Sequence, residues 1–235
     1  MEPCTTRFDA HCHLGGPLRP GSGPRQVICG TSEADWAAIL ARSATDPRAL
    51  PMLGLHPWEV PQAEPGWARR LKGLLQGHRA GVGECGLDFS RPGVNRVAQQ
   101  DALRLHLRLA RELHRPIALH VVRAWGGLLA LLREEGLPPA GAMIHAYSGS
   151  PESARTLQSM GVFLSFSGNL LRPGRPKLQA ALRAVDLDHL LLETDGQADL
   201  DEVVAAAAAL RGESPEDLAV RTWENGLRCF RELLA

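Results

Sequence analysis

Phe8-Asp9-Ala10-His11-Cys12-His13 is a short apolar run that ends in two histidines separated by one residue. Successive side chains of a β-strand point to opposite faces, so His11 and His13 leave one side of the strand and Cys12 leaves the other. An isolated pair of this kind is more often structural than functional. Two adjacent imidazoles are also half of a metal site, which ligands at the ends of other strands would complete.

The rest of the chain alternates short apolar or β-branched runs with longer segments whose apolar residues recur at helical spacing. This alternation predicts strands over residues 8–13, 26–30, 50–55, 80–84, 116–120, 142–145, 162–166 and 190–195. It predicts helices over residues 33–44, 67–76, 96–113, 125–135, 151–159, 176–185, 200–210 and 215–234. Eight such units in 235 residues favour one TIM-type (β/α)₈ barrel spanning residues 1–235, with a doubly wound sheet as the main alternative.

The segment from Leu14 to Pro24 departs from this alternation. Its glycines and prolines disfavour an ordinary crossover helix, so we expect the first helix of the barrel to be missing or vestigial. Two later helices have clear start signals instead. Ser150 and Ser214 each place a capping hydroxyl before a proline at the first helical position.

Composition excludes several classes of protein. Lys and Arg together number 26, as do Asp and Glu, so the chain has no net charge that would attract nucleic acid or a membrane, and a polyanion would have to be held locally. The five cysteines are scattered and form no CxxC pair, which is typical of a reducing cytoplasm. The sequence shows neither a signal-peptide pattern nor a long apolar run, so we expect no export and no membrane span.

Four further polar residues close predicted strands: Glu84, His120, His145 and Asp195. The carboxyl ends of all strands in a (β/α)₈ barrel surround one mouth, so these residues should converge with the histidine pair of the first strand. Four histidines and two carboxylates are donors for two divalent cations, nitrogen favouring Zn or Mn and oxygen admitting Mg. Taken singly, each has an ordinary structural explanation. The chain has no GxSxG, P-loop or GxGxxG motif to indicate other chemistry.

Asp9 and Glu193 lie two positions before His11 and Asp195 and therefore share the inward face of their strands. Each is expected either to orient a ligand or to serve the structure.

His56 and Arg123 also follow predicted strands. His56 is expected either to contact an anionic substrate or to be a turn histidine before Pro57. Arg123 is expected either to contact a phosphate or to cap the next helix. The remaining histidines fall in helices or at a strand start and are expected to be structural or exposed: His78, His106, His114 and His189.

Several motifs occur in order across nearly the whole chain: FDAHCHL, GLHPW, GVGECGLDF, IALHVVRAW, IHAYSGS, VFLSFSG, LLLETD and TWENGLRCF. Together they resemble the TatD family of metal-dependent deoxyribonucleases. The H-x-H and ETD pieces are shared with the wider amidohydrolase superfamily, whereas GECGLD and SFSG are more specific.

The resemblance implies two divalent ions (Mg, Mn or Zn), with Glu84 as the bridging carboxylate and His56 as a phosphate contact. It implies these metal ligands: His11, His13, Glu84, His120, His145 and Asp195. The implied reaction is hydrolysis of phosphodiester bonds in DNA, often exonucleolytic, with single-stranded DNA as the expected substrate. Two-metal sites hold ions about 3.5–4 Å apart that activate water and stabilise phosphoryl charge. We regard Asp195 as the candidate general base beside that water.

The chain also departs from the family pattern. Trp58 stands where the family usually has histidine, and Arg123 lies one residue later than the usual arginine. After Asp195, residues 196–199 lead directly into a helix instead of a long substrate-facing loop. A shortened rim leaves two alternatives to a nuclease: a two-metal hydrolase of small amides, lactones or phosphoesters, and a metal-binding partner protein with weak activity.

Overall fold

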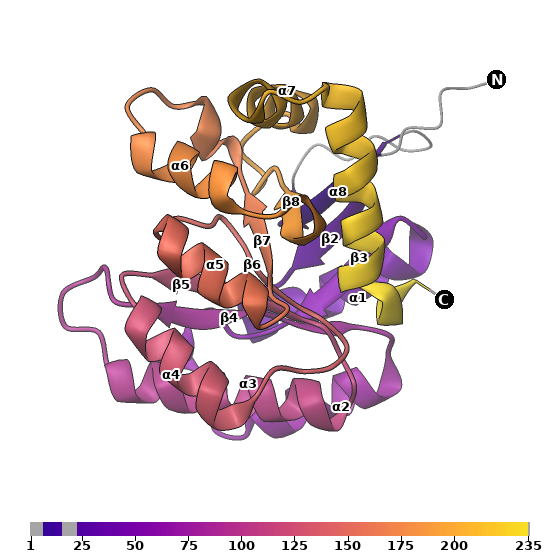
Figure 1. Cartoon of the computed structure of the whole chain (residues 1–235). Helices are drawn as coiled ribbons and strands as arrows, with labels where there is room; N and C mark the ends of the chain where they lie inside the picture. Colours follow the sequence, from indigo (N-terminus) through magenta and orange to yellow (C-terminus); the bar gives the residue numbers. More distant parts are fainter. Residues whose placement is uncertain (1–6, 16–22, 235) are drawn as a thin grey trace.

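Eight parallel strands form a nearly closed barrel in the computed structural model, which describes residues 7–15 and 23–234 (Figure 1). Each strand pairs with the next one along the chain. The strands are β1 (Phe8–Cys12), β2 (Arg25–Cys29), β3 (Ala49–Leu53), β4 (Gly81–Asp88), β5 (Ile117–Val122), β6 (Ala142–Ile144), β7 (Phe163–Phe166) and β8 (Leu190–Leu192). The predicted TIM-type (β/α)₈ fold is therefore confirmed.

Helices surround the strands, as Figure 1 shows. They are α1 (Glu33–Thr45), α2 (Trp67–Gly77), α3 (Arg96–Glu112), α4 (Trp125–Glu135), α5 (Pro151–Ser159), α6 (Pro176–Ala184), α7 (Leu200–Arg211) and α8 (Pro215–Cys229). Every helix except α8 agrees with its predicted bounds to within one residue. Ser150 and Ser214 accept the expected capping hydrogen bonds from the backbone N–H groups of Ser153 and Asp217. Residues 13–15 and 23–24 contain no helix, and the rest of the Leu14–Pro24 segment lies outside the described residues.

Helix α8 is shorter than predicted, because the helix ends at Cys229 and Arg231–Leu233 form a 3₁₀ turn. Phe230 leaves the helix and stacks on Phe8 at the amino end of β1, with ring centroids 5.9 Å apart. A Cβ atom at Gly226 would lie 2.4 Å from the Phe8 ring, so only glycine allows the helix to approach this closely.

Strands β4 and β5 are longer than predicted, because they keep pairing as far as Asp88 and Val122. Glu84 and His120 therefore lie inside their strands, and the prediction that they end them was wrong. Both side chains still reach the mouth of the barrel, because the two strands extend beyond the ends of their neighbours.

Apolar side chains fill two layers. The inner layer, inside the barrel, includes Ala10, Val27, Cys29, Met52, Ala118, Met143 and Leu191. The outer layer lies between strands and helices and contains Cys12 and Cys85, on the side opposite the candidate ligands, as strand alternation predicted.

Within the described part of the chain, no helix combines the length and apolar character that crossing a membrane would require.

Asp9 joins the last strand to the first. Its buried carboxylate accepts hydrogen bonds from the N–H and hydroxyl of Thr194, at 2.8 and 2.7 Å. The N–H of Asp195 donates to the carbonyl of His11 at 3.0 Å, which also joins the segment after β8 to β1. Burial raises the pKa of Asp9 to about 7. Asp9 thus anchors the segment that carries Asp195, and its described hydrogen bonds reach no candidate imidazole.

His106 is a buried histidine of α3 that ties the helix to the end of β3. Its Nδ1 donates to the carbonyl of Ala102 at 2.7 Å, and its Nε2 accepts the N–H of Leu55 at 3.2 Å. The ring of Trp67 stacks on it at 4.8 Å. Burial lowers the pKa of His106 from 6.5 to about 4, so this imidazole is neutral at physiological pH.

Neutral His106 should make folding stability depend on pH. Because its folded pKa lies below the unfolded value, its contribution is complete above pH 6.5 and is lost as the pH falls toward 4. Between about pH 7.5 and 5.5, the parent should lose roughly 1 kcal/mol more unfolding free energy than His106→Gln, measured by urea titration. His78→Gln, at the exposed end of α2, should retain the parent's dependence. Equal losses in the parent and His106→Gln would contradict this assignment.

Candidate metal centre

The structure brings all six predicted ligands together at the mouth of the barrel. Three of them lie in strands β1, β4 and β5, and the other three follow the ends of β1, β6 and β8 by one to three residues. Three overlapping groups have ligand atoms within 4.8 Å of one another: His11, His13 and Asp195; His11, Glu84 and His145; His56, Glu84 and His120. The convergence expected from strand ends of a (β/α)₈ barrel is therefore present.

Glu84 lies at the centre of these groups, and its two oxygens face different histidines. Oε2 lies 3.3 and 3.6 Å from the Nε2 atoms of His11 and His13. Oε1 lies 2.9 Å from both Nδ1 of His120 and Nε2 of His145. The two oxygens of one carboxylate thus face two separate sets of histidine nitrogens, which is the geometry that a bridging ligand needs.

Hydrogen bonds on the far side of two imidazoles fix which nitrogen faces Glu84. Nδ1 of His13 donates to the carbonyl of Cys29 at 2.9 Å. Nε2 of His120 donates to the carboxylate of Asp88 at 3.1 Å. Each bond places the ring proton away from the centre and leaves a lone pair pointing into it.

His145 is oriented in the same way by Glu193, which lies fully buried. Oε1 of Glu193 lies 3.3 Å from Nδ1 of His145 and also accepts the N–H of Ala146 at 2.8 Å. Of the two inward-facing acids predicted from strand alternation, Glu193 contacts a candidate ligand. Asp9 instead binds Thr194 and so connects β1 to the segment after β8.

Asp88 was missed by sequence reasoning, although it belongs to the GECGLD motif. It lies four residues after Glu84 in β4 and is 1% exposed. Burial raises its pKa, but the hydrogen bond from His120 and those from Ser90 hold the pKa well below its ordinary value. Its position on the same strand face as Glu84 was the only available signal.

The charge of Glu84 depends on the surrounding histidines. Burial raises the pKa of this carboxyl, but the imidazoles of His145 and His11 outweigh burial and hold it well below its ordinary value. Burial lowers the pKa of His145, yet Glu84 and Glu193 raise it well above its ordinary value. The centre is therefore a buried anion that requires positive charge around it.

Divalent cations fit this donor set. The assigned tautomers leave the lone pairs of His120 Nδ1 and His145 Nε2 facing each other at 3.1 Å, with an anionic oxygen of Glu84 beside them. Three acceptors at such distances repel one another unless protons or cations lie between them. Imidazole nitrogens and carboxylate oxygens are the ligands that Zn and Mn accept, and the oxygens also suit Mg.

His56 has the opposite tautomer. Its Nδ1 accepts the N–H of Trp58 at 3.1 Å, so the proton of the neutral ring is on Nε2, which lies 3.6 Å from Oε1 of Glu84. Burial and the nearby imidazoles lower the pKa of His56 to about 3, so the ring is neutral. The geometry therefore favours His56 as a hydrogen-bond donor to an anion over His56 as a metal ligand.

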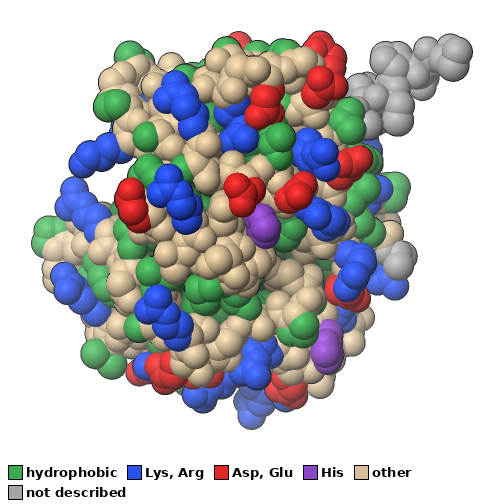
Figure 2. Space-filling view, in the orientation of Figure 1, with side chains coloured by type: hydrophobic (Ala, Val, Ile, Leu, Met, Phe, Trp, Pro, Cys, Tyr) green, Lys and Arg blue, Asp and Glu red, His purple; other side chains and the backbone are tan. Residues whose placement is uncertain are grey.

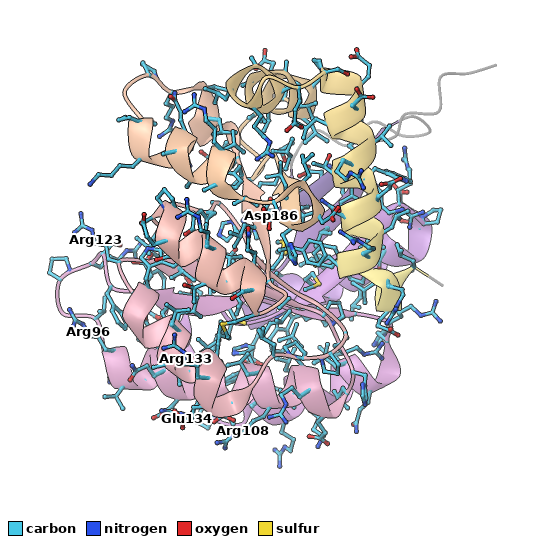
Figure 3. The ribbon with its side chains drawn as sticks, in the orientation of Figure 1. Arg96, Arg108, Arg123, Arg133, Glu134 and Asp186 are labelled. Atoms are coloured by element: carbon cyan, nitrogen blue, oxygen red, sulfur yellow. The ribbon has the colours of Figure 1, made fainter. Side chains whose placement is uncertain are left out.

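The side chain of Arg123 points to solvent. Figure 3 shows the side chains of Arg123 and Arg96 at the left-hand edge of the molecule, outside the ribbon. Arg123 is exposed and adopts a positive φ of 53°. Within the described residues its side chain forms no hydrogen bond or ion pair, and it does not cap α4.

Left-handed backbone conformations gather at the mouth. Ala146 and Asp195 lie two and three residues after β6 and β8 and have φ values of 42° and 51°. Such conformations cost of order 1–3 kcal/mol in residues other than glycine and persist where the surroundings enforce them. Here the hydrogen bonds from Ala146 to Glu193 and from Asp195 to His11 enforce them.

Comparison with known proteins identifies the family. The TatD related DNase family matches residues 8–231, nearly the whole chain. The chain belongs to the TatD related DNase family. It is a metal-dependent hydrolase of this family, as the motifs in its sequence predicted.

Relatives with similar sequence and structure agree with this membership. The chain is 30% identical over 252 residues to the "uncharacterized metal-dependent hydrolase YcfH" of Escherichia coli K12, covering 94% of each protein. It is 32% identical over 199 residues to the "3'-5' ssDNA/RNA exonuclease TatD" of Cronobacter sakazakii, covering 75% of each. The crystal structure of the TatD homologue YJJV from Escherichia coli K12 has a TM-score of 0.87 and 26% identity, covering 97% of this chain and 98% of that one.

Replacing Asp88 should weaken metal binding in this TatD-family chain. Asp88→Asn keeps the size of the side chain but removes the charge that orients His120, and loss of such an outer partner typically costs about 10–100-fold in metal affinity. Competition with a chromogenic chelator measures the change. Asp101→Asn, on the exposed surface of α3, should bind metal as the parent does. Equal affinities in the parent and Asp88→Asn would show that Asp88 does not orient a ligand.

Proposed function

We propose that this protein hydrolyses phosphodiester bonds in single-stranded DNA, as an exonuclease, with two divalent metal ions. The main support is Glu84, whose two oxygens face separate sets of histidine nitrogens. One set, completed by Asp195, comprises His11 and His13, and the other comprises His120 and His145. The relative from Cronobacter sakazakii is itself named an exonuclease of single-stranded DNA and RNA, which also supports this substrate class.

Two divalent cations in this centre would supply Lewis acidity and neutralise phosphoryl charge. Asp195 is the proposed general base, because its carboxylate lies on the partly exposed side of the cluster. Burial raises the pKa of Asp195, but the hydrogen bond with His13 and the charges of His145 and His11 hold it below its ordinary value. Asp195 is therefore ionised at neutral pH and can take a proton from an attacking water.

Local cations and hydrogen-bond donors would hold the phosphate. His56 offers its Nε2 proton toward the centre, and we propose that this proton contacts a phosphoryl oxygen. A cavity of about 350 Å³ beside Asp195 is lined by Arg172, a cation suited to phosphate. Arg123 remains a proposed contact to a more distant phosphate. Figure 2 shows basic and acidic side chains interspersed over one face, so attraction of a polyanion depends on such local groups.

Hydrolysis of small amides, lactones or phosphoesters is a second candidate. It is favoured by the short connection after Asp195, where residues 196–198 lead to Asp199, the capping residue of α7. A rim this short leaves the mouth accessible to small molecules.

We also propose that residues 1–235 form one domain and that the protein is cytoplasmic. Free thiols agree with a reducing compartment, and the described cysteines are all free and buried: Cys12, Cys29, Cys85 and Cys229.

Removing Glu84 tests the site assignment. Glu84→Gln and Glu84→Ala should lower kcat/KM for a single-stranded oligonucleotide by at least about 100-fold, because one preorganised charged group of the centre is lost. Circular dichroism should show that the fold is retained. Glu134→Gln, on the exposed face of α4 (Figure 3), should cleave as the parent does. If Glu84→Ala cleaves as well as the parent, the site assignment is wrong.

Metal removal and a substrate panel separate the alternatives. Chelation should abolish cleavage, and added Mg, Mn or Zn should restore it. The panel contains single-stranded DNA together with small phosphodiesters, amides and lactones. Turnover of the small compounds without DNA cleavage would favour the second candidate. Metal content near zero by elemental analysis would instead favour a partner protein whose metal-dependent activity is weak or lost.

A further inference from the structure

Trp58 presents an aromatic surface to solvent beside the candidate metal centre. It is 38% exposed, whereas Trp36 is only 3% exposed. The Trp58 ring lies edge-on to His56, with centroids 4.9 Å apart, and 6.4 Å from the ring of His120. A large apolar side chain is thus exposed at the edge of the centre, where a bound strand would pass.

Arg91 lies on this ring. Its guanidinium carbon is 3.4 Å from the centroid of the Trp58 ring, and the side chain is exposed. Within the described residues, no hydrogen bond or ion pair occupies its N–H groups. A guanidinium stacked by its face keeps these donors in its plane, where they can bind a phosphate.

The buried amide of Gln99 holds the Trp58 and Arg91 loops in fixed positions. Its Oε1 accepts the N–H of Asp88 at 2.9 Å, and its Nε2 donates to the carbonyl of Pro57 at 3.1 Å. Asp88 in turn accepts the N–H of Ser90 at 2.8 Å, directly before Arg91. The same Asp88 contacts His120, so the loops are also tied to the metal centre. The pair is therefore preorganised.

We propose that Trp58 and Arg91 form a nucleobase platform for the strand whose phosphodiester is cleaved, an inference that rests on the proposed nuclease function. An unpaired base stacks on the Trp58–Arg91 pair, and Arg91 donates to an adjacent phosphate. Stacking accepts every base, so the platform binds single strands without selecting sequence. A base within a duplex is covered by its neighbours and must first be unstacked. The platform thus favours unpaired strands over duplexes and over small esters without a base.

Removal of single bases from the substrate tests the platform. The substrates are short oligothymidylates in which one of the three nucleotides at either end lacks its base. In the parent, removal at one position should raise KM roughly 5- to 150-fold, which corresponds to the free energy of stacking one base. In Trp58→Leu the same removal should change KM by less than about twofold, because the stacking surface is already lost. Arg91→Lys keeps the charge but not the planar group, so its dependence on the base should lie between those of the parent and Trp58→Leu.

A second tryptophan–arginine pair provides the matched control. The guanidinium carbon of Arg25, at the start of β2, lies 6.0 Å from the ring centroid of Trp223, which belongs to α8. This pair lies at the end of the barrel opposite the mouth. Trp223→Phe and Arg25→Lys should retain the base dependence of the parent.

The outcomes separate the platform from the proposed function. If Trp58→Leu keeps the parent's base dependence, or if no base affects the parent, the platform is wrong while cleavage by the parent still supports the nuclease function. If the parent cleaves none of the oligonucleotides, the nuclease function is wrong and the platform with it.

Discussion

A buried carboxylate, Glu84, is the constraint on which the mouth of this barrel depends. An unpaired carboxylate buried this deeply would destabilise the fold by several kcal/mol. Imidazoles beside both oxygens of Glu84 offset this destabilisation. Protons on those imidazoles can balance the charge, and divalent cations can replace the protons. The charge of Glu84 can therefore be balanced in two ways, by protons on the histidines or by metal.

The backbone must be unusually close-packed to bring Glu84 to this position. A Cβ atom at Gly86 would lie 2.0 Å from the carbonyl oxygen of His120 on β5, and one at Gly54 would lie 2.6 Å from the carbonyl oxygen of Glu84 itself. Larger residues would push β3 and β5 away from β4. The glycines around Glu84 thus serve the spacing of the strands, and through it the distances between the carboxylate and the histidines.

Sequence alone predicted the fold and the convergence of the six candidate ligands, because both follow from local patterns. Helix bounds were predicted well where caps mark them, as at Ser150 and Ser214. The end of α8 was missed, because no glycine or proline follows Cys229 and apolar residues continue to Leu234. The role of Asp88 depends on His120, a contact between residues 32 positions apart that no local pattern contains.

The acidity of the centre explains why the metal ions and the rim must act together on a phosphate. Glu84 and Asp195 both have pKa values below their ordinary range, so both are anionic at neutral pH, and only protons on the surrounding histidines or bound cations offset their repulsion of a phosphodiester. The chain as a whole is neutral and supplies no compensating field. Bound cations would add positive charge at the centre, but their charge is screened within about 10 Å in salt. A strand longer than one nucleotide therefore needs contacts outside the centre, and the exposed arginines beside it, Arg91 and Arg172, are placed to provide them.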